Sequence, residues 1–542
     1  MLWFAFAGVL FEIYRPALHG DFVSDDIGYV PTNPWIQRMH SADVLAILNP
    51  WGGPASYTSN WAPVTLFLHA TEWHFFGQGT PGYHSVNLCL HALVTTLLIP
   101  LFVRAGIHVW VAIVLSALFL VHPANVEAVA WISQLKTLAS TAFGLGALLA
   151  HPRRPLLAVA LFLGAILTKA TAFFVLPVAA YWVLVRRREG SIAPQRAGWL
   201  LAWGALFLMY LSPQFSAFYR GNVAGATLDP DPFVALRTLV ALGARYLALA
   251  ATGIGVSPFH QPPNASSLFD PWWLAGLAAG SLIAWRAFVT LRRVSPEGGF
   301  WVWAAFAYAP VSQIFPFLYP IGDRYLYDIL PALFGALALT AGEALSRLDE
   351  RRGAVGKPSL RASPALARVG LFAALAVAAA WSLMSVRASA NWQTPWTLTK
   401  ATARNYPDGM SGHMLKAQAA ALKSDAPTAV AELYRAADLG FDRFLFLPTE
   451  PTFAAIRNDP GFRAFVSDLA GKWIGMARIR GYDSQPELRV WAQAHMLRGE
   501  YAEAVDRLER AAAVGGPQDE LTRVELEHAR AKLKEKQAAA TP

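Results

Sequence analysis

The chain has 542 residues, of which 55% are hydrophobic and 15% are charged. This composition is too apolar for a soluble protein of that length, so we expect an integral membrane protein. The net charge of +9 comes from Lys and Arg residues in loops beside apolar runs. Because they form no interleaved basic and aromatic stripe, we expect no nucleic-acid partner. The single cysteine, Cys89, lies inside an apolar run and excludes an intramolecular disulfide.

The charged residues divide the chain into two parts. Up to about Ser389 they sit in short clusters between apolar runs, whereas from about Thr394 they recur every few residues. This change predicts an all-α protein with a transmembrane domain over residues 1–389 and a soluble helical-repeat domain over residues 390–542. Residues 1–18 have no basic stretch before the apolar run and no small-residue cleavage site. We therefore expect a first transmembrane helix there rather than a signal peptide.

The apolar runs and the positions of the arginines predict the topology. A crossing helix needs about 20 mostly apolar residues. We expect about eleven spans, near residues 1–18, 84–103, 106–121, 136–150, 155–168, 171–185, 197–212, 272–291, 299–315, 326–345 and 369–387. A further run at 235–255 is assigned to an outward-lying or re-entrant helix. Counted as a span, it would put Arg292, Arg293 and the 347–368 loop on the wrong side, because basic loops stay in the cytosol.

With this topology, three segments share the non-cytosolic face. They are the long loop of residues 20–83, the HPANVEAVAW loop of residues 122–131, and the loop around Asp323 and Arg324. The repeat domain follows the last span on the same side. We therefore expect a bacterial inner-membrane protein whose functional loops and repeat domain face the periplasm.

The first outer loop begins with the sequence DFVSDDIGYVPTNPWI, which carries Asp25 and Asp26 just beyond the first span. Two adjacent carboxylates repel one another, which raises the pKa of one unless a cation is near. That pattern suits a general base or a metal site. The alternative is a solvated turn in which the two residues only cap a helix.

The second outer loop and the span ends beside it bring further charges to the same face. Glu127 and Lys136 lie near the outer interface, where a carboxylate and an ammonium group can reach one volume. Lys169 lies between two short apolar runs and is expected to bring a further ammonium group to this interface. The alternative is that its side chain only snorkels to the surface. His122 has no second His or Cys at ligand spacing nearby, so we expect no metal ligand.

The third outer loop, YPIGDRYLYDILP, carries Asp323, Arg324 and Tyr325 at a membrane boundary. The guanidinium fork suits phosphate oxygens, and the tyrosines suit an interfacial belt. A simple interfacial anchor is the alternative. Together, the three loops predict a site that handles a lipid-borne phosphate and a hydroxyl acceptor, since a phosphate leaving group needs cations and the acceptor needs a carboxylate.

The C-terminal part matches itself at an offset of 75 residues. The matched positions are Ala417 and Ala492, Leu422 and Leu497, Ala429 and Ala504, Leu433 and Leu508, Ala436 and Ala511, and Gly440 and Gly515. Small residues let paired helices approach, and a Gly ends the second helix, as in tetratricopeptide-type hairpins. Such arrays offer a groove for an acceptor or partner protein. The alternative is a helical cap without a ligand.

The order of the motifs resembles a known family. DFVSDDIGYVPTNPWI, NWAPVTLFLHATEWHFFG, PGYHSVNLCLHAL, LFLVHPANVEAVAWIS, TKATAFFVLPV and DRYLYDILPALFG, followed by the repeats, resemble the bacterial relatives of the transmembrane and tetratricopeptide repeat-containing protein O-mannosyltransferases. This family is similar to the C-type glycosyltransferases. The resemblance implies an inverting transfer from a polyprenyl-phosphate-linked sugar on the outer side of the membrane, with the repeat domain presenting the acceptor protein.

The resemblance also implies roles for individual residues. Asp25 or Asp26 would deprotonate the acceptor, Glu127 and His122 would shape the sugar and acceptor pocket, and Arg324 with Lys136 and Lys169 would hold the lipid phosphate. The predicted catalytic residues are Asp25, Asp26 and Glu127. The predicted substrate-binding residues are His122, Lys136, Lys169, Arg245, His260, Asp323, Arg324 and Tyr325. No metal ligand is predicted, and the lipid-linked sugar is the expected donor.

The chain departs from the family pattern at three places. Relatives often read Glu-Arg-Lys-Asp where this chain has residues 134–137, with Gln134 and Thr137 replacing the acids. Relatives read Ser-Lys-Glu where this chain has Ala170 after Lys169, and a Lys that often follows Arg-Tyr on the outward helix is absent after Tyr246. These changes leave open a non-catalytic scaffold of the same fold, as well as transfer to a lipid or glycan. A transporter is least favoured, because the charges gather at one face rather than at the midplane.

Overall fold

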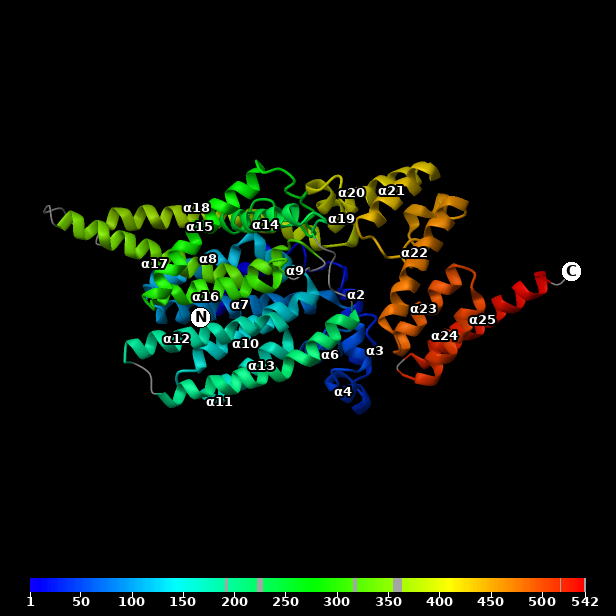
Figure 1. The fold of residues 1–542 in the computed structure, drawn as a ribbon, viewed down its shortest axis with the longest axis horizontal. Coiled ribbons are helices and arrows are strands. Elements are labelled where there is room, and N and C mark those ends of the chain that lie inside the picture. The colour runs from blue at the N-terminus through cyan, green and yellow to red at the C-terminus, as the bar shows by residue number, and fades with distance from the viewer. Residues whose placement is uncertain (191–193, 222–227, 315–318, 354–362, 517, 541–542) are drawn as a thin grey trace. The chain divides into compact units, whose positions relative to one another are not determined.

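The computed structural model describes the chain except for residues 191–193, 222–227, 315–318, 354–362, 517 and 541–542 (Figure 1). The described residues form helices and contain no strand, which confirms the predicted all-α class. They divide into two compact units. The membrane unit holds the described residues of Met1–Pro31, Ala62–Ser212 and Ala224–Leu398, and the repeat unit holds those of Thr32–Trp61, Pro213–Val223 and Thr399–Pro542.

The membrane unit is built from long helices joined by short helical turns. Its α-helices are α1 (Leu2–Ile13), α2 (Asp26–Tyr29), α6 (Pro63–Phe76), α7 (Thr80–Arg104), α8 (Val109–Val121), α9 (Val126–Ala130), α10 (Leu135–Ala150), α11 (Pro155–Thr168), α12 (Val175–Arg188), α13 (Pro194–Gly221), α14 (Pro232–Thr252), α15 (Pro271–Arg292), α16 (Pro296–Tyr308), α17 (Leu326–Gly353) and α18 (Pro364–Ser389). The last residues of α13 belong to the repeat unit. Neighbours in sequence pack side by side, as α10 does with α11 and α16 with α17 (Figure 1).

Short 3₁₀ turns connect several of these helices and carry much of the candidate site. They are η1 (Pro123–Asn125), η2 (Ile132–Gln134), η3 (Ala170–Phe174), η4 (Ala309–Val311), η5 (Asp323–Tyr325) and η6 (Ala390–Trp392). Prolines begin many of the helices, because a proline at the first helical position loses no hydrogen bond and already has a helical φ angle. The turns η1 and η2 each lie between two helices, and η5 leads directly into α17.

Within the described residues, seven helices are long and apolar enough to cross a membrane, or eight if α8 and the bent segment Pro123–Ala130 form one span. Each of the eleven runs expected to cross overlaps a helix of the membrane unit in the described part of the chain. Several of these, such as Leu2–Ile13 and Pro155–Thr168, are shorter apolar helices. These findings support an integral membrane protein.

The run at 235–255, which the sequence assigns to an outward-lying or re-entrant helix, corresponds to α14. This helix of 21 residues passes the same test of length and hydropathy. It packs on α15, and the main-chain oxygen of Ala250 near its end accepts a hydrogen bond from His122. Its outward or re-entrant placement stays a prediction.

The repeat unit contains stacked helical hairpins. Its C-terminal helices are α19 (Pro395–Asn405), α20 (Met410–Ala421), α21 (Ala426–Asp438), α22 (Pro460–Arg480), α23 (Gln485–Leu497), α24 (Tyr501–Val514) and α25 (Asp519–Ala540), with a 3₁₀ turn η7 at Pro451–Ile456. The first residues of α19 belong to the membrane unit. The matched small and apolar residues of the 75-residue offset pack inside these hairpins and are at most 1% exposed: Ala417, Ala429, Leu433, Ala436, Ala492, Ala504, Leu508 and Ala511.

Two pairs of matched positions differ from the rest. Leu422 and Leu497 lie at helix ends and are exposed. Gly440 and Gly515 follow α21 and α24 with φ angles of +102° and +65°, which a residue with a side chain rarely adopts. The glycines therefore end the second helix of each hairpin, as the repeat pattern predicts.

The repeat unit also includes a segment from the first outer loop. Residues Thr32–Trp61 form α3 (Pro34–Arg38), α4 (Ser41–Leu48) and α5 (Gly53–Tyr57). Ser56 Oγ donates a hydrogen bond of 2.7 Å to Oε1 of Glu487 on α23, and both residues are buried. A side chain at Gly53 would lie 2.9 Å from the ring of Trp35 and 3.3 Å from Ser484, so glycine allows this close approach. The sequence predicts one domain over 1–389, whereas the contacts join this loop segment to the repeats.

Candidate active site

Asp26, the first residue of α2, is fully buried and holds the first outer loop in place. Its Oδ1 accepts a hydrogen bond of 2.7 Å from the main-chain N–H of Ser133, and its Oδ2 accepts one of 3.0 Å from Val23. Burial raises the pKa of Asp26 to about 7, although the two main-chain hydrogen bonds oppose this shift. Both carboxylate oxygens are thus occupied, and the residue fastens α2 to the η2 turn.

Asp25, its neighbour, has the opposite environment. It is exposed at the N-cap position of α2, yet its side chain makes no capping hydrogen bond. Within the described part of the chain no hydrogen bond or ion pair engages its carboxylate. Ser24 before it has a φ angle of 53°, a left-handed conformation that costs energy for a non-glycine residue. Of the two acids, only Asp25 has an exposed carboxylate without a hydrogen-bond partner in the described part of the chain.

Glu127 and Arg324 form the buried ion pair of the site. The main-chain N–H of Arg324 donates to Oε2 of Glu127 at 2.7 Å, and its guanidinium Nη1 donates to Oε1 of the same carboxylate. Glu127 is 2% exposed and Arg324 is 8% exposed. This two-point contact joins the second and third outer loops, and a buried pair of this kind depends on both partners being present.

Trp131 connects this ion pair to the Asp25–Asp26 loop. Its indole Nε1 donates a hydrogen bond of 3.2 Å to the main-chain oxygen of Val23. The guanidinium carbon of Arg324 lies 5.3 Å from the centre of the Trp131 ring. The three outer loops therefore meet around Trp131, as the predicted topology requires, and Asp26 and Arg324 lie on the same side of the unit.

Lys169 lies beside this cluster on a polar chain of side chains. Its Nζ donates to Oγ1 of Thr137 at 2.8 Å, and Thr137 Oγ1 donates to Oε1 of Gln134 at 2.6 Å. The ammonium group is within electrostatic range of the Asp328, Arg324 and Glu127 side chains. Thr137 thus binds the lysine through its hydroxyl, Gln134 binds Thr137 in turn, and Asp328 supplies a buried negative charge near the ammonium group.

Lys136 adds a second ammonium group. Its Nζ lies 4.2 Å above the centre of the Tyr29 ring, which belongs to α2. Lys169 is also within electrostatic range of Lys136. Two lysines from α10 and the turn before η3 therefore bring positive charge to the segment that carries Asp25.

Asp323, in the third outer loop, has a structural role. Asp323 Oδ1 lies 2.8 Å from Nε2 of His260, and Oδ2 accepts a hydrogen bond of 2.8 Å from the main-chain N–H of Ser257. Tyr325 accepts a hydrogen bond of 3.1 Å from Nη2 of Arg324. Asp323 and His260, both predicted to bind substrate, thus hold the segment after α14 beside the Arg324 turn.

His122 and Arg245 are the two remaining predicted substrate-binding residues. His122 Nδ1 accepts the main-chain N–H of Ala124 at 3.1 Å, so its Nε2 is protonated and faces the main-chain oxygen of Ala250 at 3.1 Å. Both ring nitrogens are occupied, which leaves neither for a sugar or a metal. The guanidinium carbon of Arg245 lies 4.7 Å from the centre of the Trp272 ring.

The sequence did not single out one pair of buried titratable residues on α6. His69 Nδ1 lies 2.8 Å from Oε2 of Glu72, and both side chains are at most 6% exposed. His69 Nε2 and Glu72 Oε1 have no hydrogen-bond partner in the described part of the chain. Burial raises the pKa of Glu72, and the His69 contact opposes this. Tyr29 of α2 packs on His69, with ring centres 6.1 Å apart, so the pair lies next to the Asp25 loop. The separation of three residues between His69 and Glu72 within NWAPVTLFLHATEWHFFG is the sequence signal that indicates such a pair on one face of a helix.

The described residues contain no group of three or more His, Cys, Asp or Glu side chains arranged to hold a metal ion. The polar atoms of the cluster are instead paired with each other, with main-chain groups or with aromatic rings. The site can therefore offer one exposed carboxylate, two ammonium groups and a buried ion pair to a substrate.

Comparisons with known proteins show which proteins this chain is similar to. No protein-family model matches the chain. Protein O-mannosyl-transferase F38B6.6 of Caenorhabditis elegans is 32% identical over 145 residues, 26% of this chain and 21% of that protein. Protein O-mannosyl-transferase Tmtc2 of Drosophila melanogaster is 30% identical over 225 residues, 37% of this chain and 23% of that protein. Protein O-mannosyl-transferase TMTC1 of Mus musculus is 32% identical over 135 residues, 23% of this chain and 14% of that protein.

The chain is similar to protein O-mannosyl-transferases over these segments. The resemblance inferred from the motif order is thereby confirmed. The chain spans no more than 23% of the length of these three protein O-mannosyl-transferases.

Proposed function

We propose that the chain is a membrane glycosyltransferase that moves a sugar from a polyprenyl phosphate to a hydroxyl group on a protein. The similar proteins are named protein O-mannosyl-transferases, which supports the transfer of a sugar to protein. The observation that carries the proposal is the contrast within the acidic pair. Asp26 is buried and bonded to Ser133, whereas Asp25 is exposed and unpaired at the start of α2, the helix whose Tyr29 ring contacts Lys136.

In the proposed reaction, Asp25 is the general base. Its carboxylate takes the proton of the acceptor hydroxyl while the acceptor oxygen forms a bond to the anomeric carbon of the sugar. The bond between that carbon and the phosphate oxygen breaks, and the electron pair leaves with the polyprenyl phosphate. Attack from the face opposite the phosphate inverts the anomeric centre. A positioned base of this kind accelerates a reaction about 10²–10⁴-fold.

The leaving phosphate is stabilised by the two lysines. The ion pair with Glu127 neutralises the charge of Arg324 in the resting site. Lys136 and Lys169 therefore carry the net positive charge that balances the developing phosphate. Electrostatic stabilisation of a leaving group is strongest when the cations are held in place in advance, as Thr137 holds Lys169.

The remaining parts of the proposal follow from the topology. We place the site on the periplasmic face of a bacterial inner membrane, since the arginine clusters favour the cytosol. The repeat unit, with its stacked hairpins, presents the acceptor protein. In this scheme, neither the proton transfer to Asp25 nor the departure of the phosphate needs a metal ion.

The test uses purified protein in nanodiscs, synthetic polyprenyl phosphate carrying radiolabelled mannose, and a periplasmic protein extract. Label in the protein fraction is expected for the wild type and for Asp21→Asn, a matched change of an exposed acid in the same loop. Asp25→Asn should lower the transfer rate at least about 100-fold. Equal rates for Asp25→Asn and the wild type would contradict the proposal.

The competing functions give different results in the same assay. Label that enters a lipid or free glycan fraction would indicate a different acceptor class. A wild type that transfers no label but retains a partner protein would favour the scaffold, an alternative that the acids missing at Thr137 and Ala170 keep open.

A further inference from the structure

A second polar region lies at the C-terminal end of α7, within the membrane unit. A pocket of about 50 Å³ opens there between α7, α10, α12 and the start of α16. Its charged lining residues are Arg104, Arg186 and Glu189. Its apolar lining residues include Trp182, with Leu101, Ala105, Leu148 and Val185. A small basic pocket with apolar walls is suited to a ligand that has both an anionic and an apolar part.

Three guanidinium groups from three separate segments gather at this pocket. Arg104 donates a hydrogen bond of 2.6 Å to the main-chain oxygen of Leu149, which directs it to the end of α10. Arg153, in the turn after α10, is close enough to repel both Arg104 and Arg186 electrostatically. Glu189 is the acid of the pocket lining and is close enough to attract Arg186. Three positive charges and one negative charge leave an excess of two, which favours an anion.

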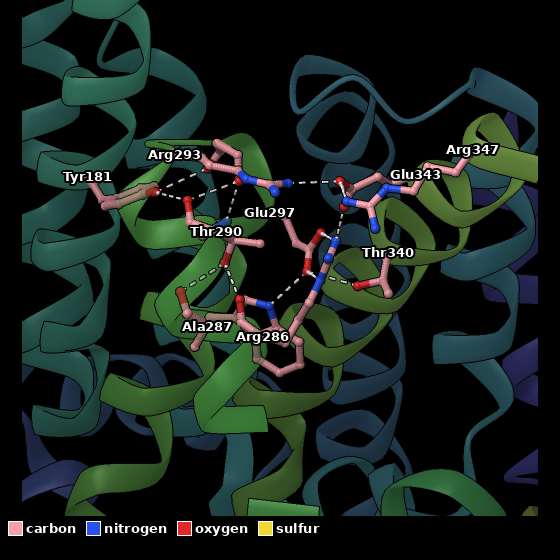
Figure 2. A network of polar contacts seen from close by, with 12 residues as sticks. Tyr181, Arg286, Ala287, Thr290, Arg293, Glu297, Thr340, Glu343 and Arg347 are labelled. Atoms are coloured by element: carbon pink, nitrogen blue, oxygen red, sulfur yellow. Dashed lines mark hydrogen bonds and ion pairs between the residues drawn. The ribbon is translucent and has the colours of Figure 1, made fainter. Parts of the chain in front are cut away.

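The other acids near the pocket do not offset this excess positive charge. Pro296 lines the pocket, but the next residue, Glu297, binds Arg286 through hydrogen bonds of 2.7 and 2.5 Å (Figure 2). Glu343 lies between Arg286, Arg293 and Arg347, with hydrogen bonds of 2.9 Å to Arg293 and 2.5 Å to Arg347 (Figure 2). These carboxylates balance their own arginines, so the pocket keeps its excess positive charge.

The pocket is separate from the candidate active site. Asn87, near the start of α7, donates a hydrogen bond of 3.1 Å to the main-chain oxygen of Trp131 and so marks the active-site end of that helix. Arg104 is the last residue of the same helix. The 17 residues from Asn87 to Arg104 correspond to about 25 Å along the helix axis. A phosphate bound at Arg104 therefore cannot be the leaving group of a reaction at Asp25.

We propose that this pocket binds the phosphate group of an anionic phospholipid from the surrounding membrane. The arginines contact the phosphate as charged donors, and the acyl chains run along the apolar wall beside Trp182. Basic pockets between membrane helices on the cytosolic side suit such headgroups, and the arginine clusters favour that side for this end of α7. The inference does not depend on the proposed sugar transfer.

The test compares lipids retained by the purified protein. The full chain is placed in phosphatidylcholine nanodiscs with increasing fractions of phosphatidylglycerol, and native mass spectrometry counts the lipids that stay bound after release. The wild type should retain one phosphatidylglycerol about tenfold more than phosphatidylcholine. The double change Arg104→Gln and Arg186→Gln should abolish this preference.

The matched control removes the same charge from the same end of the unit. Arg154→Gln with Arg187→Gln changes two exposed arginines that do not line the pocket, and it should keep the preference. Equal loss in both double variants would show a general surface attraction and overturn the proposal. Inorganic phosphate that displaces the retained phosphatidylglycerol from the protein in the mixed nanodiscs at equal concentration would point to free phosphate and would also overturn it.

A second readout requires no change to the arginines, which guards against a folding defect in the double variant. Phosphatidylglycerol with brominated acyl chains should quench Trp182 more than brominated phosphatidylcholine does. The difference in quenching between the two lipids should disappear in Trp182→Phe. Equal quenching of the wild type by the two lipids would contradict binding at this pocket.

Discussion

Oδ1 of Asp26 accepts a hydrogen bond of 2.7 Å from the main-chain N–H of Ser133, 107 residues away in the chain. This contact gives the two adjacent acids different roles. Asp26 connects the first outer loop to the second, and Asp25 is left exposed. A pair that looks symmetric in sequence is thus divided into one structural residue and one candidate base.

Asp26→Asn should destabilise the membrane unit. The amide keeps one acceptor oxygen but places an N–H₂ group against a main-chain donor, either Val23 or Ser133, that the carboxylate now satisfies. Leaving a buried donor unpaired costs about 1–3 kcal/mol. A lower thermal unfolding midpoint in nanodiscs is the expected result. Asp25→Asn is the control and should unfold at the wild-type temperature, because its carboxylate has no partner to lose.

The stability of the unit should depend on pH through Asp26. Burial raises its pKa from 3.8 to about 7 in the folded protein, so the folded state favours the protonated acid. The stabilisation is complete below about pH 4 and is lost as the pH rises through about 7. The unfolding midpoint should fall over this window, and Asp26→Asn should remove that part of the dependence. A wild-type midpoint that rises from pH 4 to 7 would show that the carboxylate is stabilised as the anion.

Lys169→Met should weaken donor binding. The change removes an ammonium group held by Thr137 and leaves Asp328 without its nearby positive charge. A charged hydrogen bond contributes about 1.5–3 kcal/mol, so KM for the polyprenyl-phosphate sugar should rise about tenfold or more. Lys169→Arg keeps the charge and should recover part of this loss. Unchanged KM in Lys169→Met would exclude the lysine from phosphate binding.

Ser56→Ala should loosen the loop segment within the repeat unit. Its hydroxyl donates to Oε1 of Glu487, which is 7% exposed, so the change leaves a buried carboxylate oxygen without that donor. A loss of about 1–3 kcal/mol should appear as faster hydrogen exchange across residues 53–57 and α23. Ser41→Ala, an exposed serine of the same segment, should leave exchange unchanged. Deleting residues 394–542 would also remove Glu487, the hydrogen-bond partner of Ser56. Such a variant would therefore disturb the loop segment as well as remove the repeats.

Much of the arrangement could be predicted from the sequence. Apolar runs fix the positions of the helices, and arginine clusters fix which loops share a face, so the meeting of Asp26 and Arg324 on one side follows from physical rules. The small residues of the repeats also identify the interior of the hairpins. These features depend on local composition, which the sequence contains directly.

Other features depend on partners that composition does not identify. The different environments of Asp25 and Asp26 come from a main-chain group of Ser133, and the two ring nitrogens of His122 are occupied by main-chain groups as well. The packing of residues 32–61 with the repeats comes from Ser56 and Glu487, 431 residues apart. Side chains of the right chemistry were recognised, but their hydrogen-bond partners required the fold.

The location of a bound donor tests the central claim most directly. An experimental structure of the protein with a polyprenyl phosphate should show the phosphate within about 4 Å of Lys136 or Lys169, on the side of the unit that carries Asp25. The lipid chain should leave that site toward the membrane. Phosphate density confined to the opposite end of α7, with none at the lysines, would contradict the account of sugar transfer at Asp25.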